Sequence, residues 1–209
     1  SVSTQHYAFA VNAFVNVIEA LDNNEYEFTL RETRTYDIIE DVKNFRSEIG
    51  ILYLSDFNEK VITKFFKENH LVFTPLFTAE PHVFVSSTHP LSKRKIITLD
   101  DLADFPCLAF EQGEYNSFYF SEEILSTAPH KKIIHVSDRA TLFNLLIGLN
   151  GYTICTGILN NNLNGDNIIS VPLRTNERMN VGWIKNEKSA LSGFAESYID
   201  ELKRLIDEY

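Results

Sequence analysis

The chain has 209 residues, of which 44% are hydrophobic and 23% are charged, which is ordinary for a globular protein. This length accommodates one large domain, or two small domains that each have a hydrophobic core. The 29 acidic residues outnumber the 19 basic ones, so the formal net charge is -10 at pH 7. Because the phosphate backbone of DNA would repel such a chain, we expect these residues alone not to bind nucleic acid.

The sequence shows no apolar run as long as a membrane span and no signal peptide. Its two cysteines, Cys107 and Cys155, lie in the apolar runs PCLAF and YTICTG, which are typical of buried strands. Two buried thiols without a disulfide framework suit a reducing compartment, so we expect a cytoplasmic protein with no membrane association. The chain begins without Met and inside an expected strand, which leads us to expect that further sequence precedes it.

The segment 7–21 has the spacing of a helix but is apolar nearly all round. Only Asn12, Asn16 and Glu19 are clearly polar, so one covering sheet would not bury all of its apolar faces. We therefore expect a contact with a second subunit through this helix. The neighbouring segment YEFTL at 26–30 alternates as a strand does and is expected to extend the same contact.

The rest of the chain alternates between strand and helix patterns in two series. This order is the signature of the α/β class, and the late return of the chain predicts two small lobes joined by crossing strands. Ligands of such proteins usually bind in the crevice at the carboxyl ends of the strands. Strands are predicted at 48–55, 71–77, 82–87, 107–110, 132–137, 152–157, 168–173 and 179–186, and helices at 35–44, 98–105, 116–125, 139–150 and 192–206.

The opening residues Ser3, Thr4 and Gln5 stand directly before the first predicted helix. One interpretation is the capture of an anion, because the N-terminus of a helix offers backbone N–H groups and the positive end of the helix dipole. The alternative is an ordinary Ser/Thr helix cap that binds nothing.

No catalytic motif is present. The sequence lacks a GxSxG elbow, an HExxH pair, a CxxC pair and a phosphate-binding loop. Its six histidines do not have the spacing of metal ligands. We therefore expect neither an enzyme nor a metal site, and no cofactor.

Three segments stand in an order and at spacings that resemble the effector-binding domain of LysR-type transcriptional regulators. They are SEIGILYLS at 47–55, the run from Pro75 to Pro106, and LLIGLNGYTICTG at 145–157. The middle segment is the most specific, with PL before Glu80, then HPL, then the pattern I-x-L-x-D-L that ends in Pro106. The chain departs from the family pattern at Glu48, where Asp is usual, and at Thr156, where Pro is common.

The resemblance implies a fold like that of type II periplasmic binding proteins, with an effector cleft between two lobes. Lobe I would comprise residues 1–82 and 184–209, and lobe II residues 83–183. It also implies a homodimer through 7–21 and 26–30, and a tetramer in the full-length protein. DNA would be bound only by a winged helix-turn-helix that precedes Ser1.

The family's effector contacts map onto positions in both lobes. In lobe I they are Ser3, Thr4 and Gln5 after the first strand, Arg34 and Thr35 in the turn after the second, and Tyr53 at the end of the third; in lobe II they are Tyr115, Asn116 and Thr141. Hydroxyl, amide and guanidinium groups suit a small organic anion or an amino-acid-like effector. The Thr-Gln pair is similar to that of sulfur-assimilation members, which favours a sulfur-containing or acetylated amino acid. For Arg34 the alternative is a surface residue near Glu32.

Two other classes of protein share this fold. The first is the solute-binding protein of a transporter, which the family-specific segment disfavours; a signal peptide upstream would support it. The second is an enzyme with a periplasmic-type fold, which would need an acid, a base or a nucleophile in the crevice, and none is apparent in the sequence.

Overall fold

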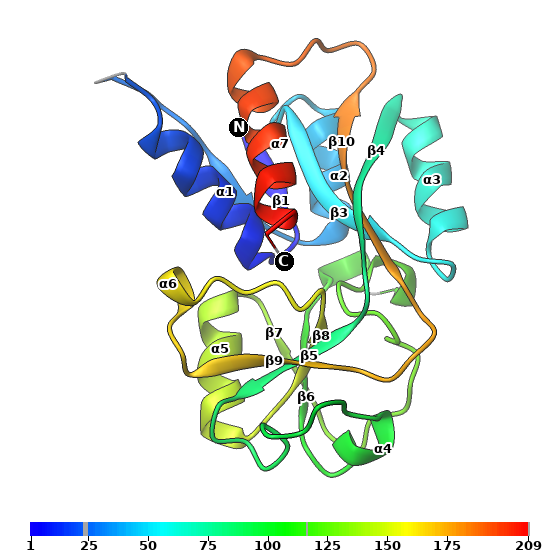
Figure 1. Cartoon of the computed structure of the whole chain (residues 1–209). Helices are drawn as coiled ribbons and strands as arrows, with labels where there is room; N and C mark the ends of the chain where they lie inside the picture. Colours follow the sequence, from blue (N-terminus) through cyan, green and yellow to red (C-terminus); the bar gives the residue numbers. More distant parts are fainter. Residues whose placement is uncertain (23–24, 116, 209) are drawn as a thin grey trace. The chain divides into compact units, whose positions relative to one another are not determined.

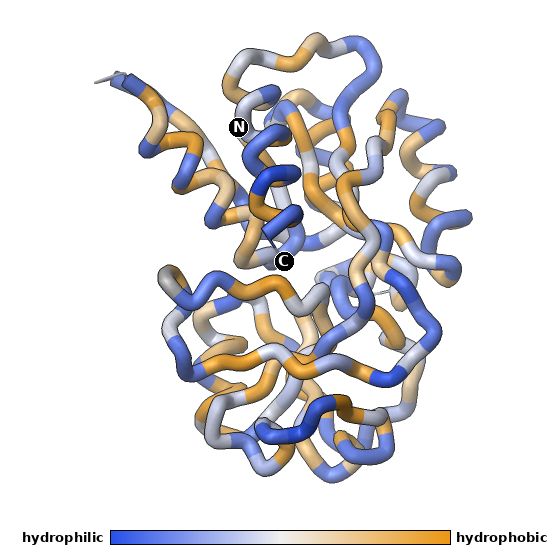
Figure 2. Tube along the Cα trace, viewed as in Figure 1, coloured by the Kyte–Doolittle hydropathy of each residue, from blue (hydrophilic) through white to orange (hydrophobic). Residues whose placement is uncertain are grey.

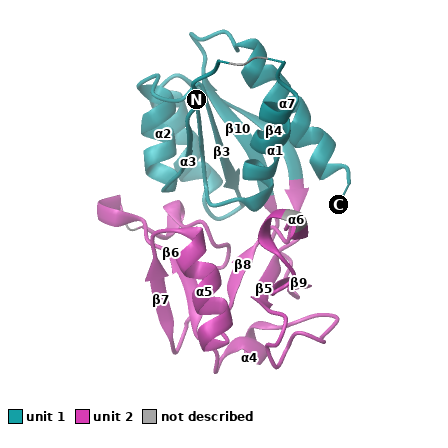
Figure 3. Ribbon diagram, turned by 90° about the vertical axis from the view of Figure 1, so that its left-hand side faces the viewer, with its two compact units in different colours: residues 1–77, 180–209 teal, residues 78–179 magenta. Residues whose placement is uncertain are grey.

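The computed structural model describes residues 1–22, 25–115 and 117–208. The chain forms two compact units, in which unit 1 comprises Ser1–Phe77 and Asn180–Tyr209 and unit 2 comprises Thr78–Met179 (Figure 3). The unit boundaries fall within two strands, β4 (Leu71–Ala79) and β10 (Met179–Asn186). They therefore lie a few residues earlier than the boundaries after 82 and 183 expected from the sequence.

Unit 1 is built on a five-stranded sheet with the order β2-β1-β3-β10-β4. Strand β1 pairs in parallel with β2 and β3, and β10 runs antiparallel to β3. Every residue of β3 is buried, as its continuous apolar run predicts. The remaining bounds are β1 (Val2–Thr4), β2 (Leu30–Glu32) and β3 (Ile49–Leu54).

Helices cover both faces of this sheet. Figure 3 shows α1 (Ala8–Glu19) and α7 (Gly193–Ile206) on one side and α2 (Thr35–Lys43) and α3 (Glu59–Glu68) on the other. Helices α1 and α7 pack together, and the buried hydroxyl of Tyr198 in α7 donates a hydrogen bond of 2.8 Å to a carbonyl of α1. Figure 2 shows that α7 alternates between hydrophobic and hydrophilic residues, as expected of a helix with one face on a sheet.

Helix α2 lies close to β3 because Gly50 has no side chain. A Cβ atom at this position would lie 2.5 Å from Cγ2 of Ile38 and 3.1 Å from Cγ2 of Val42. A larger residue would therefore push α2 away from the sheet. This close packing fixes the start of α2 beside the carboxyl ends of β1 and β3.

Unit 2 contains an antiparallel sheet with the order β8-β5-β9 and a parallel pair β6-β7. A backbone bridge between Cys107 and Tyr152 connects the pair to the segment before β8. The bounds are β5 (His82–Ser86), β6 (Cys107–Phe110), β7 (Ile133–Val136), β8 (Thr153–Cys155) and β9 (Ile168–Pro172), with helices α4 (Leu99–Leu102), α5 (Arg139–Leu149) and α6 (Asn161–Asn164), as Figure 1 labels them.

The family-like segment HPL and the helix after it have structural roles in unit 2. His89 is buried; its Nδ1 accepts a hydrogen bond from the backbone N–H of Leu91 at 3.0 Å, and its Nε2 lies 3.1 Å from the carbonyl of Asn150. Thr98 caps α4 in a capping box with Asp101. These residues therefore stabilise the loops of unit 2.

The strand predicted over 26–30 is wrong for most of its length, since β2 spans Leu30–Glu32. Strand β1 begins at Val2, whose partner in the register is the first residue of β2. Residues 25–29 are not part of a strand, although the carbonyl of Thr29 accepts a hydrogen bond of 2.9 Å from the backbone N–H of Val2. Phe28 instead stacks on Phe194 of α7, with ring centroids 4.2 Å apart.

The helix predicted over 116–125 is also wrong. The structure has a short 3-10 turn, η2 (Phe118–Phe120), and the segment after it is not helical. Leu125 has a φ of 64°, a left-handed conformation that cannot continue an α-helix. The carboxylate of Glu123 accepts a hydrogen bond of 2.9 Å from the backbone N–H of Phe110, so the segment is attached to β6 by a side chain.

Candidate functional site

The side chain of Gln5 connects the ends of three elements of unit 1. It is fully buried at the carboxyl end of β1. Its Nε2 donates to Thr35 Oγ1 at 2.6 Å, and its Oε1 accepts from the hydroxyl of Tyr7 at 2.7 Å and from the backbone N–H of Tyr53 at 3.1 Å. Three residues expected in the effector site, Gln5, Thr35 and Tyr53, are therefore brought together, which we call the Gln5 cluster.

Ser3 lies in a separate network beneath α2. Its hydroxyl donates to Oδ2 of Asp41 at 2.6 Å and lies 2.8 Å from Oγ of Ser47. Oδ1 of Asp41 in turn accepts from Nε of Arg46 at 2.9 Å. The Ser3 side chain therefore points toward the later part of α2 and not toward the Gln5 cluster, and its hydroxyl has a structural role there.

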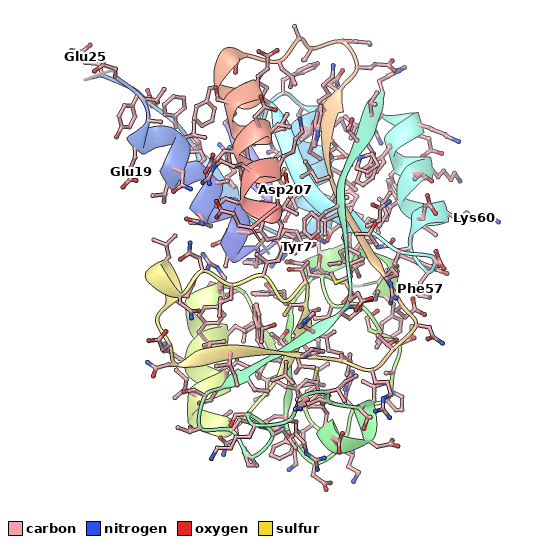
Figure 4. All side chains as sticks on the ribbon, viewed as in Figure 1. Tyr7, Glu19, Glu25, Phe57, Lys60 and Asp207 are labelled. Atoms are coloured by element: carbon pink, nitrogen blue, oxygen red, sulfur yellow. The ribbon has the colours of Figure 1, made fainter. Side chains whose placement is uncertain are left out.

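The interpretation of residues 3–5 as a helix cap is wrong. Helix α1 begins at Ala8, its N-cap is Tyr7, and the side chain of Tyr7 makes no capping hydrogen bond. Thr4 Oγ1 donates to the carbonyl of Gln5 at 2.8 Å. The backbone N–H of Gln5 still bonds to a carbonyl of β3, so the chain remains extended past Thr4 before α1 begins. Figure 4 labels Tyr7 at the first end of α1 and Glu19 at its other end.

Arg34 stands at the N-cap of α2, in an extended conformation directly after β2. Its side chain makes no capping hydrogen bond to its own helix. Helices α1 and α2 therefore both begin at the carboxyl ends of adjacent parallel strands, and both lack a side-chain cap from their N-cap residues. Helix N-termini attract anions, and the guanidinium of Arg34 adds a permanent positive charge at this edge of the sheet.

The expected site residues of unit 2 lie at two places. Thr141 is exposed in the first turn of α5, where its backbone N–H and its hydroxyl both donate to the N-cap Asp138, at 2.8 and 2.7 Å. Tyr115 is 48% exposed at the end of the 3-10 turn η1 (Gly113–Tyr115). Asn116, the third expected residue, lies outside the described residues.

Neither a metal site nor a membrane span is found in the part of the chain that the structure describes. No group of three or more His, Cys, Asp or Glu side chains there could hold a metal ion. The described helices are all too short or too polar to cross a lipid bilayer.

Comparison with known proteins identifies the family. Residues 9–206 match the family described as the LysR substrate binding domain. The chain belongs to the LysR substrate-binding domain family. This family consists of effector-binding domains of transcriptional regulators and not of enzymes, as the resemblance of the sequence implied, and its members have the two-lobed fold of periplasmic binding proteins.

Solved structures of this LysR domain's fold cover nearly the whole chain. The effector-binding domain of QuiR in complex with shikimate is 19% identical, with a TM-score of 0.62, 100% of this chain and 96% of that chain being covered. The reduced OxyR regulatory domain from Pseudomonas aeruginosa is 13% identical, with a TM-score of 0.67 and coverages of 97% and 96%. The MetR regulatory domain from Neisseria meningitidis is 10% identical, with a TM-score of 0.63 and coverages of 99% and 93%. No curated protein matches the chain.

Sequence reasoning missed two features of this LysR domain. Tyr7 was assigned to the apolar stripe of the first helix, yet its hydroxyl belongs to the Gln5 cluster. The neighbouring carboxyls of Glu122 and Glu123 are buried in unit 2, within the segment that the sequence predicts as a helix. A signal for the second feature is present, because the pair stands between aromatic and aliphatic residues in the sequence FYFSEEIL.

Both cysteines of the LysR domain are free, Cys107 in the core and Cys155 half-buried. Burial raises the pKa of each thiol to about 12. The thiolate is the reactive form of cysteine, and at pH 7 a thiol of this pKa is ionised in only about one molecule in 10⁵. Chemistry that starts from a thiolate is therefore not supported at either cysteine.

We expect the native domain to react negligibly with 5,5′-dithiobis(2-nitrobenzoate) at pH 7 within an hour, because both thiols are desolvated. In 6 M guanidinium chloride, absorbance should report both thiols within minutes. A Lys64→Cys variant is the matched control, since this side chain is 74% exposed and should react without denaturant. Fast reaction of the unmodified native domain would contradict the burial of its thiols.

Proposed function

We propose that this LysR domain senses a small organic anion at the edge of unit 1 formed by the starts of α1 and α2. The single observation that supports the proposal is the meeting of two helix N-termini with Arg34 at the carboxyl ends of adjacent parallel strands. A carboxylate placed there would accept hydrogen bonds from backbone N–H groups and pair with the guanidinium.

The Gln5 cluster supports this role by fixing the groups around the proposed site. The Thr35 hydroxyl accepts a hydrogen bond from Gln5, so its own hydrogen is directed away from that amide. Tyr53 and Tyr7 are held by the other end of the same amide. A site whose polar groups are already oriented loses little entropy when a ligand binds.

The proposal retains Thr4, Gln5, Arg34, Thr35 and Tyr53 from unit 1. From unit 2 it retains Tyr115, Asn116 and Thr141 as the contacts that the family resemblance implies. Ser3 is left out because its hydroxyl is bonded within the network beneath α2.

Binding of the effector to this domain would change how the regulator binds DNA. The DNA contact itself would be made by a winged helix-turn-helix outside this chain. The net charge of -10 supports this division of roles, because the domain itself would repel a phosphate backbone. Such a regulator would act in the cytoplasm, where the two free thiols would stay reduced. The solute-binding protein of a transporter is not favoured, because the family match is to a regulatory domain.

We further propose that the domain forms a homodimer through α1 and residues 26–30, and that the full-length regulator forms a tetramer. An aromatic cluster supports this contact: Phe14 of α1 and Phe28 both pack against Phe194 of α7, at 5.6 and 4.2 Å between ring centroids. Tyr26, next to Phe28, is 57% exposed. Exposed aromatic side chains beside an apolar helix face are typical of protein interfaces.

A thermal-shift screen of organic acids and amino acids tests the proposed effector class. Shikimate is included because the structure of the QuiR effector-binding domain contains it. N-acetyl-L-serine and sulfur-containing amino acids are included because the Thr-Gln pair favours effectors of that kind. A ligand at 100 times its Kd should add about 2.7 kcal/mol of stability and raise Tm by roughly 5–10 °C. Absence of any shift across the screen would count against the anion proposal.

Replacing Arg34 by Leu should lower the affinity of the domain for the effector found in this screen about ten- to a hundredfold, because a hydrogen bond to a charged group is lost. Titration calorimetry measures the change. Arg94→Leu removes a guanidinium from an exposed loop of unit 2 and is the matched control. Equal affinities of the Arg34 variant and the unmodified domain would mean that Arg34 is a surface residue only.

A further inference from the structure

A cavity lined only by residues of unit 2 shares no lining residue with the proposed effector site. It has a volume of about 60 Å³ and lies between the β6-β7 pair and the segment 117–130. Its wall is mostly apolar, with Phe110, Phe118, Ile133 and Ile154 among the lining residues. Its polar groups include the carboxyl of Glu123 and the imidazoles of His130 and His135, all from unit 2.

Glu123 is the only carboxyl group among the residues that line this cavity, and it is 5% exposed. One oxygen accepts from the backbone N–H of Phe110 at 2.9 Å, and the other accepts from the hydroxyl of Ser121 at 3.1 Å. The backbone N–H of Glu123 itself also donates to this carboxyl group. All three donors are neutral. Because a carboxylate has about four acceptor positions, these three donors do not fill them all.

No cation of the described residues compensates the charge of Glu123. The neighbouring charge that acts on it is that of Glu122, which is also a carboxylate, and burial together with this charge raises the pKa of Glu123 to about 8. A buried carboxylate is costly unless a cation pairs with it or a proton neutralises it. The cavity therefore contains an acidic group that a bound cation would stabilise.

We propose that this cavity of unit 2 binds the ammonium group of a small primary aliphatic amine, with the carboxylate of Glu123 as its counter-ion. The ammonium would donate to the remaining acceptor positions of Glu123, and the short alkyl chain would pack against the apolar wall. The rings of Phe110 and Phe118 add faces that attract a cation.

The size of the cavity and the neutral ring of His130 are consistent with this ligand. A volume of about 60 Å³ is several times the roughly 10–15 Å³ that one water molecule needs, so the cavity accommodates an ammonium group with a short alkyl chain. Burial lowers the pKa of His130, so its ring is neutral at pH 7 and does not repel a cation. Nδ1 of His130 lies 3.0 Å from the hydroxyl of Tyr152.

Binding of the amine requires Glu123 to release its proton to solvent, since only the carboxylate can form the ion pair. The titratable groups around it are Glu122 beside it, His130 and His135 on the cavity wall, and the thiols of Cys107 and Cys155, whose raised pKa keeps them neutral below about pH 11. With a pKa of about 8, Glu123 is ionised in roughly a tenth of molecules at pH 7 and nine-tenths at pH 9. The amine should therefore bind about ten times more tightly at pH 9.

Methyl NMR of the 209-residue domain, titrated with n-propylamine, tests this site. The ligand keeps its charge at both values of pH, as a lysine side chain does, and a Kd on the order of 1–10 mM at pH 9 is expected for so small a molecule. The methyl signals of Ile124, Ile133 and Ile154, which line the cavity, should shift, and the Kd should be about tenfold higher at pH 7. Propan-1-ol, which has the same chain length but no charge, should shift none of these signals.

Glu123→Gln keeps the size and the acceptor of the side chain but removes its charge, so binding should be lost. Glu114→Gln, which neutralises an exposed carboxylate of the neighbouring turn, should leave the Kd unchanged. Absence of shifts up to 100 mM n-propylamine at pH 9 would overturn the proposal. So would a Kd that does not depend on pH, undiminished binding to Glu123→Gln, or shifts confined to unit 1.

Discussion

Gln5→Leu should be the most destabilising single substitution in the proposed effector site, lowering the free energy of unfolding by about 3–5 kcal/mol. The variant loses three hydrogen bonds at once, to Thr35, Tyr7 and Tyr53. All three partners are buried, so water does not readily replace the lost hydrogen bonds. The loss of one such buried hydrogen bond costs about 1–1.5 kcal/mol or more.

Chemical denaturation followed by circular dichroism measures this loss. Thr4→Val is the matched control, because Thr4 is equally buried but donates only one local hydrogen bond, to the carbonyl of Gln5. It should cost about 1 kcal/mol. A Gln5→Leu variant as stable as Thr4→Val would mean that the Gln5 cluster contributes little to the fold.

Val15→Glu should dissociate the proposed dimer, with a cost of about 3 kcal/mol, or more than a hundredfold in the dimer Kd. Val11, Val15 and Ile18 form a half-exposed stripe on one face of α1, at the spacing i, i+4, i+7. The other face of α1 is buried, as shown by Phe9, Ala13 and Val17. A carboxylate at the centre of the outer stripe would be buried without a partner if this face meets a second copy.

Sedimentation equilibrium gives the dimer Kd of the unmodified domain and of the variant. Val61→Glu on α3 is the control, since it places the same charge on a half-exposed valine of another helix in unit 1. It should leave the assembly unchanged. An unmodified domain that stays monomeric at 200 µM would remove the basis for a dimer through α1.

The strands were the most predictable part of the fold, because nearly all of them are short apolar runs between turns. The run 48–55 contains β3, and the two series of alternating elements correspond to the two units. Helix α3, by contrast, was not predicted. Its apolar residues Ile62, Phe65 and Phe66 have helical spacing, but five of the ten residues of this helix are charged, and of the three apolar residues only Ile62 and Phe66 are buried.

The errors share a cause in tertiary structure. Serine and threonine before a helical pattern predict a cap, but the chain stays extended through Gln5 because its N–H bonds to β3. The pattern FYFSEEIL has good helix formers, but Glu123 is used as an internal acceptor for the backbone of β6. Both local conformations depend on a hydrogen bond to a strand that is distant in the sequence. The sequence of the segment alone therefore does not predict them.

The positions of the candidate site came from the family resemblance, whereas the interactions among them came from the structure. The family resemblance pointed to Gln5, Thr35 and Tyr53, which the structure joins through one amide group. It also pointed to Ser3, whose hydroxyl is bonded to Asp41 instead. Ser3 and Gln5 are two residues apart and face the same side of the sheet, where Gln5 reaches the first residue of α2 and Ser3 reaches the later part of that helix.

Backbone NMR of the domain with an organic acid found in the screen tests most directly whether this is an anion-sensing domain. We predict that the largest amide shifts occur at the starts of α1 and α2, at Tyr7–Phe9 and Arg34–Thr35, accompanied by shifts at Tyr115 and Thr141 of unit 2. The amides of α3 should not move. Largest shifts elsewhere, or undiminished shifts in the Arg34→Leu variant, would contradict the proposed effector site.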